Sequence, residues 1–207
     1  MIFPLSKSKY EMMKEVYFQK KINLSSLFKK IRVSPKIGYR YLEELLSAKV
    51  LQEQLEGKKP TLRYLLPSFS PAGILCFALT EEEERNIFFS KHPELIGPFE
   101  QFTQGVGRTA IVILFGSFAR GGETKESDID IMLLGKIDKK KIEMLSEGSF
   151  VTVRHRPSIR ILPESKFMKS LKGKDALALQ VEDNHVIISG ALRWVELMKK
   201  NQNSQLR

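Results

Sequence analysis

Two short apolar runs around a polar loop constrain this chain more than any other feature. The first, TAIVILF, ends at Phe115 and is rich in β-branched residues, and the second, IDIMLL, begins at Ile129. Continuous apolar runs of this length are typical of strands that are buried on both faces. Between them Gly121-Gly122 predicts a turn. The sequence therefore predicts two buried strands joined by a polar loop.

Asp128 and Asp130 stand where the second run begins. Side chains alternate along a strand, so both carboxylates should lie on one side, about 7 Å apart, while Ile129 and Ile131 point into the core. Two carboxylates on one face suit Mg²⁺, which prefers oxygen ligands and often shares them with substrate phosphates. The alternative is a strand edge whose acids only keep the protein soluble.

The residues before the loop complete a pattern. Gly116 allows the backbone to approach a ligand closely, and Ser117 is expected to cap a short helix whose first amides would face a phosphate. The stretch FGSFARGGETKESDIDI has Gly-Ser, ten residues and then Asp-x-Asp. It resembles the signature of the polymerase-β-like nucleotidyltransferases and of their small subgroup, the minimal nucleotidyltransferases (MNT). The resemblance covers residues 105–200 or so.

The resemblance implies an enzyme that moves a nucleoside monophosphate from a nucleoside triphosphate, with ATP expected, to a protein or RNA acceptor. It implies Asp128 and Asp130 as catalytic residues and as ligands of Mg²⁺. The nucleotide-binding residues that it implies are Gly116, Ser117, Arg120 and Ser127. Minimal nucleotidyltransferases often act as antitoxins that nucleotidylate a HEPN-type protein, so the resemblance also implies a toxin-antitoxin role and a HEPN-type partner.

Active members of this family usually supply a third acid from a later strand. Between Glu147 and Glu164 the chain has no acid, and residues 158–160, where one is expected, are Ser, Ile and Arg. Either Glu164 or another acid completes the site, or one metal ion suffices. Alternatively, Arg160 neutralises the two aspartates, and the domain serves only in nucleotide binding or in structure.

Positive charge is concentrated at the N-terminal end. The 207 residues carry 34 Lys and Arg against 24 Asp and Glu, a net charge of +10. Residues 1–69 hold 14 of these bases and 6 of the acids, hence +8, whereas residues 70–207 hold 20 and 18, hence +2. A field concentrated in this way favours a polyanionic partner for the N-terminal end. The alternative is a basic surface that only keeps the chain soluble.

Helical spacing of apolar residues predicts three helices in the same region. They are expected in KSKYEMMKEVYFQKK, in LSSLFKKI with Asn23 as N-cap, and after Ser34-Pro35, with Ile37, Tyr41 and Leu45 as the buried stripe. Two strand-like runs, VLQEQL and TLRYLLP, then predict a hairpin. This order resembles the winged helix-turn-helix of bacterial and archaeal regulators, over residues 5–68 or so.

That second resemblance implies double-stranded DNA as a partner. The third helix would present Lys36, Tyr39 and Arg40 to a major groove, and Lys58 and Lys59 at the hairpin tip would contact phosphate. The alternative is a winged helix used only for protein contacts or dimerisation. Closed two-fold dimers are common for such regulators, so a homodimer is a candidate assembly.

The predicted elements and the two resemblances together imply an α+β chain of three parts. We expect a winged helix-turn-helix domain at residues 1–69, a helical connector at 70–107, and a nucleotidyltransferase domain with a small mixed β-sheet flanked by helices at 108–207. In the connector, Thr80 and Glu83 are expected to form a capping box at a helix start. In the last part, SFVTVRHR and SIRILPE are expected to pair as strands, and Trp194 to lie in the core.

No apolar run is long enough to span a membrane, and the N-terminal stretch lacks the features of a secretory peptide. We therefore expect a cytoplasmic protein without a membrane partner. Two hypotheses stay open. The chain is either a nucleotidyltransferase that is localised or regulated by DNA, or a transcription regulator whose C-terminal domain has become a ligand sensor or a dimerisation module.

Overall fold

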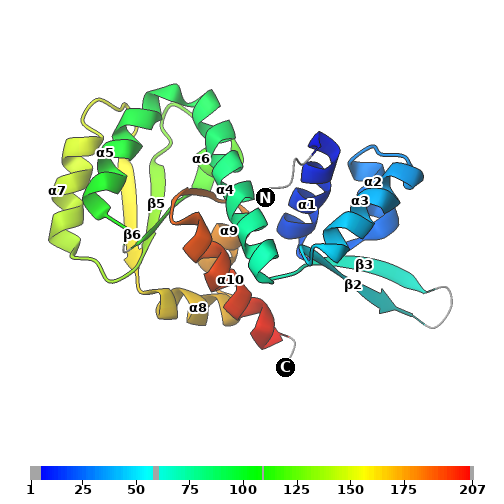
Figure 1. The fold of residues 1–207 in the computed structure, drawn as a ribbon. Helices are drawn as coiled ribbons and strands as arrows, with labels where there is room; N and C mark the ends of the chain where they lie inside the picture. The colour runs from blue at the N-terminus through cyan, green and yellow to red at the C-terminus, as the bar shows by residue number, and fades with distance from the viewer. Residues whose placement is uncertain (1–5, 58–60, 109, 206–207) are drawn as a thin grey trace. The chain divides into compact units, whose positions relative to one another are not determined.

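The computed structural model describes residues 6–57, 61–108 and 110–205. It divides into two compact units, unit 1 (Met1–Thr80) and unit 2 (Glu81–Arg207), which are described separately (Figure 1). Helix α4 (Pro71–Lys91) runs through the division. The domain boundaries expected from composition remain predictions. Within the described ranges, no helix is long and apolar enough to cross a membrane.

Among the described residues, unit 1 combines three helices, followed by the start of α4, with a three-stranded antiparallel sheet. The elements are α1 (Lys7–Gln19), β1 (Ile22–Asn23), α2 (Leu24–Lys30), α3 (Pro35–Ser47), β2 (Leu51–Glu56) and β3 (Leu62–Pro67), and the strand order is β1-β3-β2. As predicted, the Asn23 side chain caps α2 and accepts hydrogen bonds from the amides of Ser25 and Ser26 at 3.0 and 3.4 Å. The predicted helices and hairpin strands are confirmed as elements. Their assignment to a winged helix stays a prediction.

The buried face of α3 differs from the predicted one. Gly38 and Leu45 are buried, whereas Ile37 keeps 40% of its surface exposed. A Cβ atom at position 38 would lie 2.7 Å from the ring of Phe28 on α2. Because glycine alone leaves room for that ring, α3 turns this position inward, and the predicted stripe is wrong at Ile37.

The predicted capping box in the connector is also wrong. The Thr80 hydroxyl lies inside α4 and donates to the carbonyl of Cys76 at 3.1 Å, so Thr80 and Glu83 do not begin a helix. The helix begins after Ser70, whose Oγ accepts a hydrogen bond from the amide of Gly73 at 3.1 Å. A serine followed by proline is a strong helix start, and here it outweighs the interruption expected from nearby proline and glycine.

Within the part that the structure describes, unit 2 is built on a four-stranded mixed sheet. Its strands are β4 (Ile111–Phe115), β5 (Ile129–Leu134), β6 (Pro157–Leu162) and β7 (Val186–Ser189), in the order β6-β5-β4-β7. After α4 and a 3₁₀ turn at Pro93–Leu95, its helices are α5 (Ile96–Val106), α6 (Gly116–Arg120), α7 (Lys139–Ser149), α8 (Glu164–Lys172), α9 (Ala176–Asp183) and α10 (Ala191–Gln205). Strand β5 pairs antiparallel with β4 and parallel with β6, so the predicted mixed sheet is confirmed.

The predicted strand SFVTVRHR is wrong. Helix α7 extends to Ser149, and the ring of Phe150 packs 5.3 and 5.6 Å from the rings of Phe99 and Phe102. Residues 151–156 then form a loop that leads into β6. A strand parallel to β5 has to be reached by a crossover, and α7 provides it, so this segment does not form a hairpin with β6.

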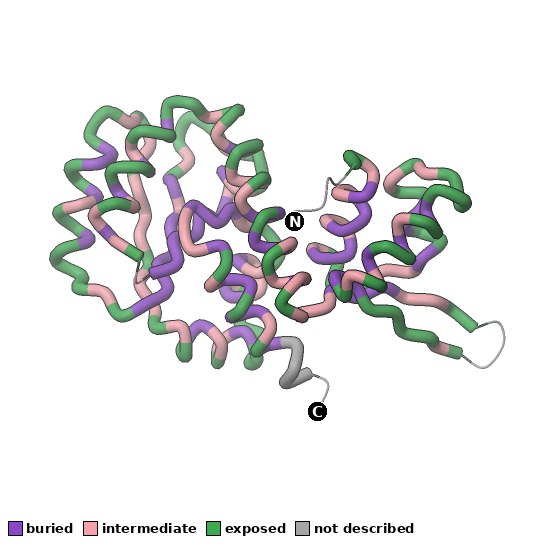
Figure 2. Tube along the Cα trace, in the orientation of Figure 1, coloured by how far each residue is buried: buried purple, intermediate pink, exposed green. Residues whose placement is uncertain are grey.

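The two faces of the unit 2 sheet are covered by different helices (Figure 1). Val112 and Leu114 of β4, with Ile129 and Ile131 of β5, belong to the core that includes residues of α5 and α7. Helix α10 contacts β4 and β7, and its Trp194 is only 1% exposed, as predicted. Figure 2 shows the resulting band of buried residues along β4 and β5. A charged residue in this sheet therefore lies in largely apolar surroundings.

Candidate functional site

The Asp130 carboxylate lies directly against the turn that follows β4. Asp130 pairs with Phe115 across the two strands, and Gly116 follows with a φ of +76°. A Cβ atom at position 116 would lie 2.2 Å from Oδ2 of Asp130. The backbone angle favours glycine, and any larger residue would force the carboxylate to move, so the turn and the acid lie in direct contact.

Asp128 immediately precedes β5 and is exposed, whereas Asp130 is half-buried. Burial raises the pKa of the Asp130 carboxyl above its usual range, and the negative charge of Asp128 raises it further. The charge of Arg160, a hydrogen bond with Ser158 and the charge of Arg120 lower this pKa but do not reverse the shift. Burial and the charge of Asp128 therefore outweigh the two arginines in their effect on Asp130.

Ser117 and Arg120 both belong to the short helix α6. The helix begins at Gly116 with Phe115 in the capping position, so the prediction that Ser117 caps it is wrong. The N–H of Gly121 (φ +67°) closes the helix on the carbonyls of Phe118 and Ser117. Arg120 is exposed, and its charge reaches Asp130. This helix therefore brings a hydroxyl and a guanidinium to the same turn.

Ser127 holds the loop between α6 and β5. Its hydroxyl accepts a hydrogen bond from the amide of Thr124 at 2.9 Å, and its carbonyl lies 2.8 Å from Nδ1 of His155. Since a carbonyl only accepts, Nδ1 must carry the proton and donate. The ring of His155 also packs edge-on against Phe118, 5.0 Å away. The sequence did not single out His155, because it lies far along the chain from the motif.

Ser158 occupies the position where the sequence suggested a third acid. It pairs with Asp130 across β5 and β6. Glu164 lies beyond the far end of β6 and forms an ion pair with Arg193 at 2.6 Å, so it does not complete the site. No group of three acidic, histidine or cysteine side chains able to hold a metal occurs in the described part of the chain.

The two aspartates nevertheless fit Mg²⁺. This ion commonly binds one or two protein carboxylates and takes its other ligands from water and substrate phosphates. Burial and the negative charge of Asp128 both disfavour the charged form of Asp130, and a divalent cation would offset both effects. The donor set therefore fits one Mg²⁺ shared with a phosphate ligand.

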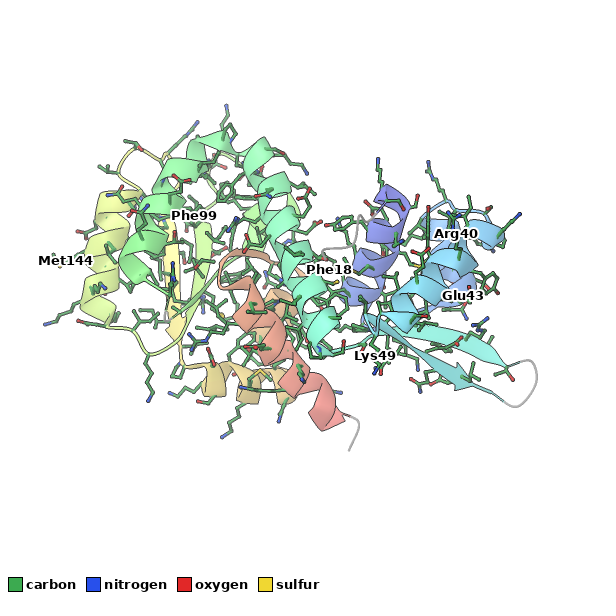
Figure 3. All side chains as sticks on the ribbon, in the orientation of Figure 1. Phe18, Arg40, Glu43, Lys49, Phe99 and Met144 are labelled. Atoms are coloured by element: carbon green, nitrogen blue, oxygen red, sulfur yellow. The ribbon has the colours of Figure 1, made fainter. Side chains whose placement is uncertain are left out.

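The candidate DNA-binding residues lie in unit 1. Lys36, Tyr39 and Arg40 are exposed on α3, and Arg40 is labelled in Figure 3. The Tyr39 ring contacts the ring of Phe28 edge-on at 5.3 Å, and the guanidinium of Arg63 lies 5.5 Å from its centre. Tyr39 is therefore partly engaged within the unit. Lys58 and Lys59 lie outside the described residues.

A comparison with family models supports the class of chemistry suggested by this geometry. Residues 99–186 match the model described as a nucleotidyltransferase domain. The matched range includes the Gly116 turn, both aspartates and Ser158. This part of unit 2 is therefore similar to a nucleotidyltransferase domain.

Among curated proteins, the "Putative protein adenylyltransferase MJ0604" of Methanocaldococcus jannaschii is 59% identical to this chain over 32 residues. The alignment covers 16% of this chain and 32% of that protein, so the chain spans about a third of the length of this relative.

Two solved structures are similar in part. One is described as the crystal structure of a toxin-antitoxin with AMP-PNP (TM-score 0.35, 14% identity, 52% of this chain and 86% of that chain). The other is described as a tri-AMPylated Shewanella oneidensis HEPN toxin in complex with MNT antitoxin (TM-score 0.32, 15% identity, 59% of this chain and 90% of that chain). At these TM-scores neither likeness bears on the fold or function of this chain.

Proposed function

We propose that unit 2 is a Mg²⁺-dependent nucleotidyltransferase that transfers a nucleoside monophosphate from a nucleoside triphosphate to a protein or RNA acceptor. The observation that carries this proposal is the Asp130 carboxylate held against Gly116, with Asp128 close enough to raise its pKa. ATP as the donor and a protein as the acceptor are favoured because the Methanocaldococcus relative is named a protein adenylyltransferase.

Each residue of the site has a role in this proposal. Asp128 and Asp130 would hold Mg²⁺, while the Gly116 turn and the Ser117 hydroxyl would contact phosphate oxygens. Arg120 would balance the phosphate charge, and Ser127 would hold the nucleotide-binding loop next to the acids. Bound Mg²⁺ supplies charge stabilisation for the α-phosphate and the leaving pyrophosphate. The acceptor hydroxyl bonds to the α-phosphorus as the bond to pyrophosphate breaks, and the hydroxyl proton passes to water.

A transfer assay tests this function. The full chain is incubated with labelled ATP, Mg²⁺ and candidate protein and RNA acceptors, beside an Asp128→Ala, Asp130→Ala variant. Because the metal is expected to lower the barrier by several kcal/mol, the variant should lose at least about 10³-fold in rate. A Glu143→Ala, Glu147→Ala variant, which removes two acids from α7, should keep the rate. Equal transfer by both variants would refute the assignment of the site.

We further propose that unit 1 is a winged-helix domain that binds double-stranded DNA. The exposed side chains of Lys36, Tyr39 and Arg40 on α3, together with the +8 charge of residues 1–69, favour it. A toxin-antitoxin role, a HEPN-type protein partner and a homodimer rest on family resemblance alone. Co-expression with a HEPN-type protein and its mass measurement would detect an added nucleotide.

A second candidate function is a transcription regulator whose nucleotidyltransferase domain has lost its activity. The specific observation in its favour is Ser158, a side chain without charge, beside Asp130 where an acid is expected. Salt-sensitive binding to a DNA duplex without transfer to any acceptor would support this regulator and refute the enzyme.

A further inference from the structure

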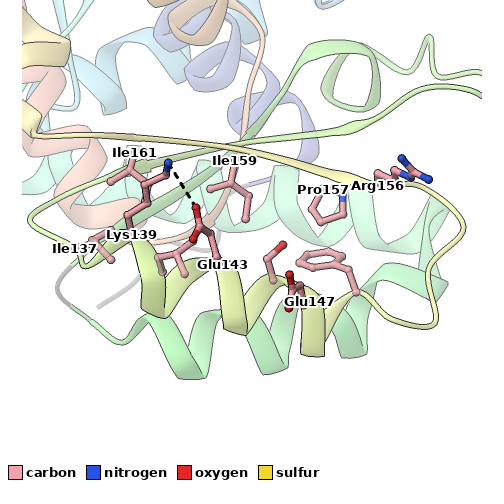
Figure 4. Close-up of a pocket in the computed structure, with 11 residues that line it drawn as sticks. Ile137, Lys139, Glu143, Glu147, Arg156, Pro157, Ile159 and Ile161 are labelled. Carbon is pink, nitrogen blue, oxygen red and sulfur yellow. Dashed lines mark ion pairs between the residues drawn. The ribbon is translucent and has the colours of Figure 1, made fainter.

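Strand β6 has two different faces. Ile159 and Ile161 line a pocket of about 700 Å³ together with residues of α7 (Figure 4). Side chains alternate along a strand, so Ser158 and Arg160 lie on the opposite face, beside Asp130 of the neighbouring strand. Ordinary strand spacing puts the Cα atoms of Arg160 and Asp130 about 8 Å apart on the diagonal. An arginine side chain at this position can reach the space in front of the two acids.

Arg160 does not form an ion pair that would neutralise Asp128 and Asp130. It is exposed, and among the described residues it forms no ion pair. A guanidinium that neutralised the pair would lie in contact with the carboxylates and favour their charged forms. The guanidinium of Arg160 is therefore available to a ligand.

The charge balance of the site indicates which ligand. One divalent cation cancels the two carboxylates, so a bound triphosphate would bring several uncompensated negative charges. Arg120 from α6 and Arg160 from β6 both reach Asp130 electrostatically and supply positive charge from separate elements. Arginine suits this task because its planar guanidinium forms two parallel hydrogen bonds with phosphate oxygens.

We propose that Arg160 binds the triphosphate of the nucleotide together with Arg120, and that this arginine pair selects a triphosphate over a monophosphate. The inference rests on the proposed function of unit 2 and adds Arg160 to its binding residues. In this arrangement, positive side chains take over charge compensation that a further acid-bound metal ion would otherwise provide.

Nucleotide binding without an acceptor tests the inference. Calorimetry on the full chain with Mg²⁺ measures the affinities for ATP and AMP. The Arg160→Ala variant should bind ATP roughly ten- to a hundredfold more weakly, the loss expected for hydrogen bonds between charged groups, with little change for AMP. Arg160→Lys, which keeps the charge without the planar fork, should lose less. Lys139→Ala removes a charge from α7, where Lys139 pairs with Glu143, and should bind ATP normally.

A measurement of metal binding distinguishes an Arg160 that binds the triphosphate from an Arg160 that only neutralises the two acids. Mn²⁺ binding in the absence of nucleotide, followed by electron paramagnetic resonance, should not weaken in Arg160→Ala, because the substitution removes a competing positive charge. Tighter binding of both Mn²⁺ and ATP by the variant would overturn the inference, since Arg160 would then only neutralise the acids. Unchanged ATP affinity would overturn it as well.

The same data distinguish the inference from the proposed function. If the unaltered chain binds ATP through Arg160 but transfers nothing, the proposed transfer function is refuted, whereas triphosphate binding by Arg160 is supported. If the unaltered chain does not bind ATP with Mg²⁺, both fail.

Discussion

The two sheets of this protein are built from different kinds of strand. In unit 1, β2 buries Leu51 and exposes the next four residues, whereas in unit 2 every residue of β4 is buried. On the exposed strand Glu53 forms an ion pair with Arg63 of β3, as surface charges commonly do. In unit 2, Asp130 lies in a sheet that is covered on both faces, and burial raises its pKa.

This difference shows where a charge carries information about function. A charge on an open sheet is solvated at little energetic cost, so it says little about chemistry. A charge in a covered sheet costs stability unless a ligand or a partner compensates it. Asp130 is therefore a stronger indication of function than any single charge of unit 1. The charges of unit 1 indicate a function only through their summed electrostatic field.

Among the glycine, charge and pH tests of this comparison, the largest effect is expected where the covered sheet meets its turn. In Gly116→Ala the new Cβ atom would collide with Oδ2 of Asp130, displacing the acid, so transfer should fall at least about 100-fold. Gly121→Ala is the matched control. It also has a positive φ, but a Cβ atom there meets nothing within 4 Å, so it should retain most of the activity. Equal losses would mean that backbone strain, and not the contact with Asp130, controls the site.

Removing charge from α3 tests the field of unit 1. The Lys36→Ala, Arg40→Ala variant of the full chain should bind duplex DNA roughly tenfold more weakly, and the slope of log affinity against log salt should fall by about 2. Lys139→Ala, Lys140→Ala removes the same charge from α7 of unit 2. Titrations with duplex DNA at several salt concentrations measure the affinity of both variants. An equal loss of affinity would show that DNA binding does not depend on the charge of unit 1 in particular.

Packing inside unit 1 gives a smaller effect. In Gly38→Ala the Cβ atom would approach the Phe28 ring to 2.7 Å, so α2 or α3 has to shift, destabilising the unit by about 1–3 kcal/mol. Gly97→Ala in α5 meets nothing within 4 Å and should be neutral or stabilising by up to about 1 kcal/mol. Amide hydrogen exchange of α2 and α3 measures the difference. Unchanged protection in Gly38→Ala would contradict this packing.

The smallest effect concerns pH. Since the pKa of Asp130 is raised in the folded chain, the folded state binds this proton more readily than the unfolded state. The charged carboxylate of Asp130 therefore lowers the free energy of unfolding at neutral pH. This destabilisation disappears as the pH falls through the pKa that Asp130 has in the folded chain. Asp130→Asn should raise the Tm of unit 2 by about 1–4 °C at pH 7, with a smaller gain in acid. Thermal scans from pH 7 to pH 4 would test this, and a gain that grows in acid would contradict it.

Local patterns predicted most of the elements but not their contacts. Asn23 was identified as a cap because capping depends on residues adjacent in sequence, and the structure agrees. In α3 the apolar pattern predicts that Ile37 is buried, whereas the structure buries the next residue, Gly38. The reason is a contact between Gly38 and Phe28, which belongs to another helix. The capping box predicted at Thr80 is wrong for a different reason, because a local start signal at Ser70 begins the same helix earlier.

The sequence by itself determined that Asp130 lies in a strand next to a Gly-Ser turn, with Asp128 directly before that strand, because the point where an apolar run begins is a local property. Only the tertiary structure decided what stands beside them. Parallel pairing of β5 with β6 brings Ser158 and Arg160 to Asp130 and leaves Glu164 at the other end with Arg193. Pairing between strands depends on register across a crossover helix, and no local pattern in the chain encodes that register.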